Sequence, residues 1–113
     1  MTKVEIITRQ SKLEDLKAAL NEIGINGMTV TNVLGYGVQK GQKHQYRGVE
    51  YNVDLLPKIK IEMVVCTVPV EGVVNTSISV LRIGEICVGK IFVSPVSRVI
   101  KVRTGEEDRE ALL

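Results

Sequence analysis

The sequence predicts an α+β domain in which two β-α-β units build one antiparallel sheet with both helices on the same face. Three observations carry this prediction: the order of strand-like and helix-like segments, a partial internal repeat, and the size and composition of the chain. Of its 113 residues, 44% are hydrophobic and 25% are charged, a profile typical of one soluble globular domain. We therefore expect residues 1–113 to form a single domain.

The first part of the chain predicts a strand, a helix and a second strand. Residues 3–8 are β-branched and partly alternating, which favours a strand. Ser11 and Glu14 fit a capping box, and Gly24 stands where the following helix would end. Apolar residues recur between these signals at spacings of three and four, as on one face of a helix: Leu13, Leu16, Leu20 and Ile23. Residues 28–34 predict the second strand.

The second part repeats this order. Residues 58–65 alternate between polar and apolar side chains and predict a third strand. Helix-like spacing returns in a segment of mediocre helix formers, at Val70, Val73, Val74, Ile78 and Leu81. Residues 91–93 predict a fourth strand and residues 99–103 a short fifth, while residues 104–113 are expected to be a tail.

An internal repeat supports a duplicated unit. Residues 3–7 match residues 60–64 at an offset of 57, and Gly27 matches Gly84 at the same offset. A chance match is the alternative, since strands of this pattern are common, but the helix and glycine positions agree as well. A duplicated β-α-β unit with both helices on one face of an antiparallel sheet is the ferredoxin-like arrangement, βαββαβ.

The segment between the two units, residues 38–56, is too polar to be core. Connections of this length inside a small domain are uncommon and are usually functional or disordered. Tyr46 and Tyr51 lie within it and bury nothing in an exposed loop, so they are candidates for partner anchors, a modification site or packing between subunits. We expect this segment to be an exposed effector loop.

Composition excludes several classes of function. The formal net charge is +2 and aromatic residues make up only 4%, which disfavours nucleic-acid binding. Since the chain has no apolar run near the roughly 20 residues that a membrane span needs and no secretory signal, we expect a cytoplasmic protein without direct membrane insertion. Cys66, Cys87 and His44 are too few for a disulfide scaffold and make a poor metal site.

Residues 84–90 satisfy the pattern G-x4-G-K, but they do not predict a P-loop. Ile91 stands where magnesium binding needs Ser or Thr, and the predicted order is helix-loop-strand instead of strand-loop-helix. What remains is either a plain helix-to-strand turn or a glycine-containing loop that faces an anion, with Lys90 as its point charge.

Two further cations favour the anion reading. Lys101 and Arg103 alternate with Val102 on the predicted last strand, so three cations including Lys90 could converge where a polyphosphate would bind. The alternative is an ordinary exposed strand face, which commonly carries such charges. We expect no enzyme, because no nucleophile–base pair or convergent carboxylates are evident; Cys87 is more simply a small buried residue than a reactive thiol.

Five motifs in order carry a family resemblance over nearly the whole chain. They are EIGINGMTVT at 22–31, GYGVQKG at 35–41, YRGVEY at 46–51, GKIFV at 89–93 and RTGEED at 103–108. The chain resembles the PII signal-transduction (nitrogen-regulatory) proteins. The resemblance implies a homotrimer of ferredoxin-like subunits with ADP or ATP in the clefts between subunits. It also implies that the long loop regulates a membrane transporter, which would recruit the protein to the membrane, or a metabolic enzyme.

The resemblance also assigns roles to residues. Ile7, Thr29, Glu62 and Val64 would surround the adenine, and Gly35 and Gly37 would allow close approach of the backbone. The remaining nucleotide-binding positions are Cys87, Gly89, Lys90, Lys101 and Arg103, the last three on the phosphates. Gln39 matches the residue that helps to hold Mg²⁺ with ATP, Lys58 the one that pairs with 2-oxoglutarate, and Tyr51 a tyrosine uridylylated in some members.

The departures from the family pattern are concentrated in the loop ahead of Gly89, with two more elsewhere. Cys87 replaces a glycine and Glu85 a lysine ahead of Gly89, and Val38 replaces an arginine after Gly37. Lys101 replaces an arginine and keeps its charge without the planar fork. We therefore expect nucleotide binding with 2-oxoglutarate sensing weakened or lost. The alternatives are a ligand-free trimeric interaction module and a full sensor of ATP and 2-oxoglutarate.

Overall fold

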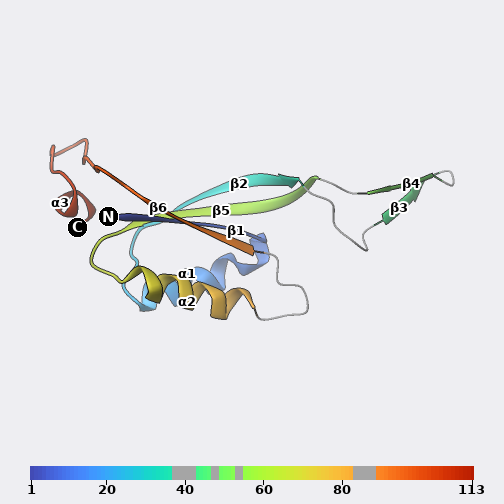
Figure 1. Ribbon diagram of the computed structural model, residues 1–113, viewed down its shortest axis with the longest axis horizontal. Coiled ribbons are helices and arrows are strands. Elements are labelled where there is room, and N and C mark those ends of the chain that lie inside the picture. The colour runs from blue at the N-terminus through green and yellow to red at the C-terminus, as the bar shows by residue number, and fades with distance from the viewer. Residues whose placement is uncertain (37–42, 47–48, 53–54, 83–88) are drawn as a thin grey trace.

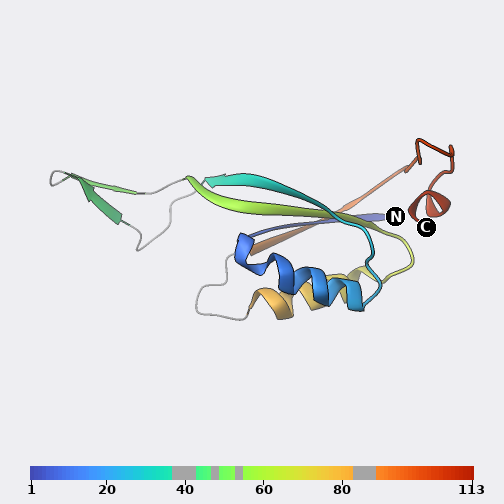
Figure 2. The same ribbon diagram turned by 180° about the vertical axis from the view of Figure 1, so that it is seen from behind.

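A four-stranded antiparallel sheet lies over α1 (Leu13–Glu22) and α2 (Val70–Leu81) in the computed structural model, which describes residues 1–36, 43–46, 49–52, 55–82 and 89–113 (Figure 1). Its strands, in spatial order, are β2 (Thr29–Tyr36), β5 (Leu55–Val65), β1 (Thr2–Thr8) and β6 (Gly89–Pro95). Figure 2 shows from behind that both helices cover the same face. The predicted α+β, ferredoxin-like arrangement is confirmed.

The register of the central strands decides which side chains form the core. β1 pairs with β5 so that Ile6 faces Ile61 and Glu5 faces Glu62. Because successive side chains of a strand alternate between faces, one face of this pair is apolar and the other is charged. The apolar face packs on the helices, and its fully buried residues join those of the helices: Val4, Ile6, Ile59, Ile61, Leu16, Leu20 and Val73.

The helices begin and end for local reasons, one of which differs from the prediction. Gly24 follows α1 with a φ of +103°, as expected for a glycine that ends a helix. The predicted capping box at Ser11 is wrong. Residues Gln10–Lys12 already form a 3-10 turn, so Ser11 lacks the extended backbone that an N-cap needs, and α1 begins at Leu13 without a side-chain cap.

The segment predicted as an effector loop contains regular structure. β3 (Lys43–Tyr46) and β4 (Val49–Asn52) pair in a separate two-stranded sheet. β5 begins at Leu55, inside the predicted loop boundary of 38–56, because residues 55–57 continue the antiparallel pairing with the end of β2, up to Tyr36.

The predicted fifth strand at residues 99–103 is also wrong. The chain folds back there, since the Lys101 N–H donates to Glu106 O and the Gly105 N–H donates to Lys101 O, both at 2.8 Å. Within this segment the strand-type pairing is limited to an isolated antiparallel bridge between Ile100 and Glu107. We call residues 98–108 the C-terminal hairpin. The predicted tail therefore starts as the return arm of this hairpin and ends in a short helix, α3 (Arg109–Leu112).

The end of α1 allows a matched test of backbone conformation. Gly24→Ala places a Cβ at a φ of +103° and should lower the free energy of unfolding by roughly 1–2 kcal/mol. Gly72→Ala, inside α2 where a Cβ meets no atom, should raise it by about 0.5–1 kcal/mol. Urea unfolding at equal protein concentration measures both. Equal effects of the two substitutions would contradict the conformational explanation.

Candidate functional site

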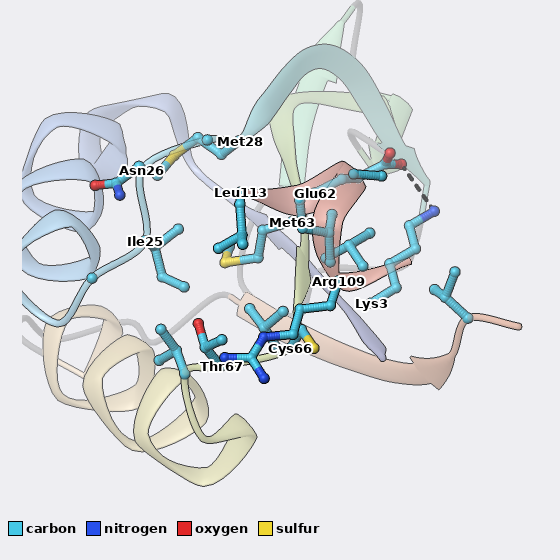
Figure 3. A pocket seen from close by; sticks show the side chains of 18 of the residues that line it. Lys3, Ile25, Asn26, Met28, Glu62, Met63, Cys66, Thr67, Arg109 and Leu113 are labelled. Carbon is cyan, nitrogen blue, oxygen red and sulfur yellow. Dashed lines mark ion pairs between the residues drawn. The ribbon is translucent and has the colours of Figure 1, made fainter. Parts of the chain in front are cut away.

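A cavity of about 870 Å³ (Figure 3) opens at the end of the sheet near which both termini lie (Figure 1). It is bounded by the segment between α1 and β2, by the end of β5 and by α3. Three side chains predicted to contact adenine line it: Thr29, Glu62 and Val64. Its volume lies within the range of roughly 300–1,000 Å³ that is usual for small-molecule sites.

A ladder of ion pairs on the open face of the sheet holds Glu62 at the wall of this cavity. Glu5 and Glu62 face each other across β1 and β5, which alone would be destabilising. Lys60 Nζ lies 3.4 Å from Glu5 Oε1 and 3.8 Å from Glu62 Oε1. Lys3 Nζ lies 3.6 Å from Glu62 Oε1 and lines the cavity itself (Figure 3). The lysines thus offset the repulsion between the two carboxylates.

Sequence reasoning missed Lys3 as a neighbour of the site. The signal was present in the repeat, which aligns Lys3 and Glu5 with Lys60 and Glu62. Two copies of the pattern Lys-x-Glu on neighbouring antiparallel strands place each lysine diagonally to a glutamate of the other strand. The repeat therefore predicts the ladder once the two strands are known to be neighbours.

A different set of predicted residues lies toward the other end of the sheet. Ile7 faces both Lys60 and Lys90 across the strands, and Gly89 faces Thr8. Gly35 has a packing role, since a Cβ there would lie 3.2 Å from Lys58 Cε. The close approach of the Gly35 backbone to a nucleotide stays a prediction.

Lys58 lies in a cationic environment that the sequence did not reveal. It lines a second cavity, of about 300 Å³, with Arg9, Leu56 and Pro57. Burial, and to a smaller extent the nearby Arg9 guanidinium, lowers the pKa of the Lys58 ammonium from its usual 10.5. Two cations beside one small cavity form a place where an anionic group would be favoured.

The three predicted phosphate cations do not converge within one chain. Lys90 is the second residue of β6. From Lys90 to the end of the strand at Pro95, the chain extends by about 17 Å. Lys101 and Arg103 follow beyond that point, in the C-terminal hairpin at the opposite end of the sheet (Figure 1). The expected convergence was wrong for a single subunit because it assumed an adjacent fifth strand, which does not form.

The described site residues therefore fall into two halves. The terminal half, next to the chain termini, comprises Thr29, Glu62, Val64, Lys101 and Arg103. The loop half, toward the long loop, comprises Ile7, Gly35, Lys58, Gly89 and Lys90. Gly37, Gln39 and Cys87 lie outside the described residues, and Tyr51 belongs to β4.

The chain matches the sequence model of a known family over residues 1–106, that of the nitrogen regulatory protein P-II. The nitrogen regulatory protein P-II of Synechocystis is 54% identical over 112 residues, 99% of this chain and 100% of the relative. The P-II 1 protein of Escherichia coli K12 is 53% identical over the same coverage. The chain belongs to the nitrogen regulatory P-II family.

Solved structures agree with this assignment. The structure of B. subtilis GlnK has a TM-score of 0.80 and 44% identity, covering 97% of this chain and 96% of that one. The structure of a B. subtilis GlnK–ATP complex has the same TM-score and coverage with 45% identity. The predicted family resemblance is confirmed, and P-II relatives are regulatory signalling proteins and not enzymes, as expected.

Two kinds of feature are absent from the described part of the chain. No helix within those residues has the length and apolar character needed to cross a membrane. No group of three or more His, Cys, Asp or Glu side chains there is placed to hold a metal ion.

The environment of Lys58 generates a pH prediction. Because its pKa is lowered in the folded state, protonated Lys58 opposes folding, and its contribution to the free energy of unfolding should rise with pH between the lowered pKa and 10.5. Arg9→Gln removes the smaller cause, so the Lys58 pKa should rise part of the way back. NMR titration of the Lys58 side chain measures this, with Lys17→Gln on α1 as a control. An unchanged Lys58 pKa in Arg9→Gln would contradict the contribution of Arg9.

Proposed function

We propose that this P-II protein is a homotrimeric signalling protein that binds ADP or ATP in the clefts between its subunits. The separation of the two halves of the site is the observation that carries the proposal. Thr29 and Gly35 stand six residues apart along β2, about 20 Å, and Lys90 lies at the opposite end from Lys101 and Arg103. One chain therefore presents two incomplete sites, which a ring of head-to-tail contacts would join.

The exposed apolar side chains of a single chain also support subunit contacts. Leu34 on β2 is 66% exposed, and Phe92 and Val93 on β6 are 47% and 51% exposed. These two strands are the edges of the sheet, and an apolar side chain on an open edge is favourably covered by a partner. A trimer would both cover them and bring the terminal half of one subunit to the loop half of the next.

In such a cleft the two halves have complementary chemistry. Thr29, Glu62 and Val64 offer a hydroxyl, a carboxylate and an aliphatic wall for the base, with Ile7 from the loop half. Lys90, Lys101 and Arg103 supply the positive charge for the phosphates. The backbone at Gly35, Gly37, Cys87 and Gly89 completes the site. A similar protein, B. subtilis GlnK, forms an ATP complex, which supports an adenine nucleotide as the ligand.

We further propose that sensing of 2-oxoglutarate is weakened or lost. Lys58 is retained, and Arg9 beside it adds to the positive charge. Cys87 and Glu85, however, replace a glycine and a lysine of the family pattern. Any Mg²⁺ would accompany ATP, with Gln39 as the protein group near it. A cytoplasmic trimer would regulate a transporter or a metabolic enzyme through residues 38–56, and a transporter partner would recruit it to the membrane.

Calorimetric titration tests nucleotide binding directly. ADP and ATP should both bind, and Lys90→Ala should weaken binding by about tenfold or more, since it removes a charge-assisted contact to phosphate. Lys17→Ala, on the solvent face of α1, is the matched lysine control and should bind like the unmodified protein. If neither nucleotide binds at millimolar concentration, the chain is a ligand-free interaction module. Micromolar binding of 2-oxoglutarate in the presence of Mg²⁺ and ATP would instead make it a full sensor.

Mixed trimers test whether each site spans two subunits. Lys90→Ala impairs the loop half and Lys101→Ala the terminal half, so homotrimers of either variant should bind ADP poorly. After the two variants are mixed through unfolding and refolding, random assembly should make about a quarter of the clefts intact. Titration should then recover about that fraction of tight sites. Recovery of no tight sites would contradict a site shared between subunits.

A further inference from the structure

We propose that α3 forms a wall of the base-binding part of the site and sets its affinity for adenine. This inference rests on the proposed nucleotide binding and adds a segment to which no role has been given. The cavity that contains Thr29, Glu62 and Val64 is closed on one side by Arg109, Ala111 and Leu112 (Figure 3). The last residues of the chain therefore line the same cavity as the predicted adenine contacts.

Local bonds fix the position of α3. Arg98 forms an ion pair with Glu107 across the two arms of the C-terminal hairpin. The Asp108 N–H donates to Val99 O at 2.7 Å, and the Val99 N–H donates to Asp108 Oδ1 at 3.2 Å. The Ala111 N–H then donates to Asp108 O at 3.0 Å, which joins the helix to the hairpin.

The backbone at Asp108 supports the same conclusion. Its φ is +56°, a conformation that residues other than glycine rarely adopt. Such a conformation persists when the surroundings hold it, as the reciprocal bonds with Val99 do here. This turn directs the chain from the hairpin back over the end of the sheet, so α3 is a built part of the cavity wall and not a loose terminus.

The volume of the cavity indicates that α3 lines the cavity and does not fill it. About 870 Å³ remains with α3 in place, which is ample for a purine base. Ala111 and Leu112 are half-buried, and they add aliphatic surface to a cavity that already presents Val64. Covering a flat base with apolar surface removes it from water and strengthens binding. Without α3 the base would be left open to solvent on this side.

The hairpin also links this wall to the predicted phosphate cations. Lys101 and Arg103 lie near the tip of the hairpin whose far end leads into α3. The α3 wall and the two cations are therefore parts of one hydrogen-bonded segment.

Leu112→Ser, which changes only the α3 wall, should weaken ADP binding while leaving the binding of inorganic triphosphate unchanged.

The test compares ADP affinity by calorimetry in the full chain, in a chain ending at Asp108 and in Leu112→Ser. We expect about a tenfold loss of affinity on deletion of residues 109–113 and a loss of several-fold for Leu112→Ser. Val102→Ser is the matched control, since Val102 is 98% exposed in the same hairpin and lines no part of the cavity. Light scattering checks that all four proteins have the same oligomeric state.

The outcomes separate the inference from the proposed function. If the full chain binds ADP and both altered chains bind it equally well, α3 is not a wall of the site and the inference is wrong. Tighter binding after deletion would also overturn it, because α3 would then obstruct the cavity. A parallel loss of triphosphate binding in Leu112→Ser would show a general structural defect and count against it. If the full chain binds no ADP, the proposed function fails and the inference fails with it.

Discussion

The strict alternation of side chains along β1 and β5 is the constraint on which the rest of this structure depends. It sends residues such as Ile6 and Ile61 into the helices and leaves Glu5 and Glu62 on the open face. A slip of one residue in their pairing would exchange the two faces and bury the charges. Except for Gly89, which pairs with the buried Thr8, the described strand residues proposed to contact a nucleotide lie on the open face. The register that builds the core therefore also places most of the proposed site.

The length of the strands is the reason why the proposed site would be shared between subunits. Side chains on one face of a single sheet cannot approach each other along the strands, and β6 keeps Lys90 well apart from the C-terminal hairpin. A ligand that bridges two subunits binds only the assembled form, so its binding energy also stabilises the assembly. In a small chain with apolar edge residues such as Phe92, the ligand and the neighbouring subunit would each make the other more favourable.

Most of the fold could be predicted from the sequence because the spacing of apolar residues indicates a helix or strand even where the residues have a weak intrinsic preference for it. Residues 70–81 are rich in Val, Ser and Thr, yet they form α2, where the buried Ser77 hydroxyl donates to Val73 O at 2.7 Å. Predictions failed where one pattern fits two structures. The alternation of Lys101, Val102 and Arg103 suits both an exposed strand and a hairpin tip, and only the backbone bonds between its arms distinguish them. The neighbourhood of Lys58 and Arg9 likewise depends on tertiary contacts that no local pattern encodes.

The division of the site also explains how one ligand could be kept while another is lost. Cys87 and Glu85, the departures that bear on 2-oxoglutarate, precede Gly89 of the loop half in the sequence. The terminal half keeps a hydroxyl, a carboxylate, an aliphatic wall and two cations, and its only departure is Lys101, which preserves charge. If most base contacts come from the terminal half and the 2-oxoglutarate contacts from the loop half, as proposed, substitutions in one half could weaken one response without removing the other. A nucleotide sensor with little or no sensitivity to 2-oxoglutarate is then a natural variant of this architecture.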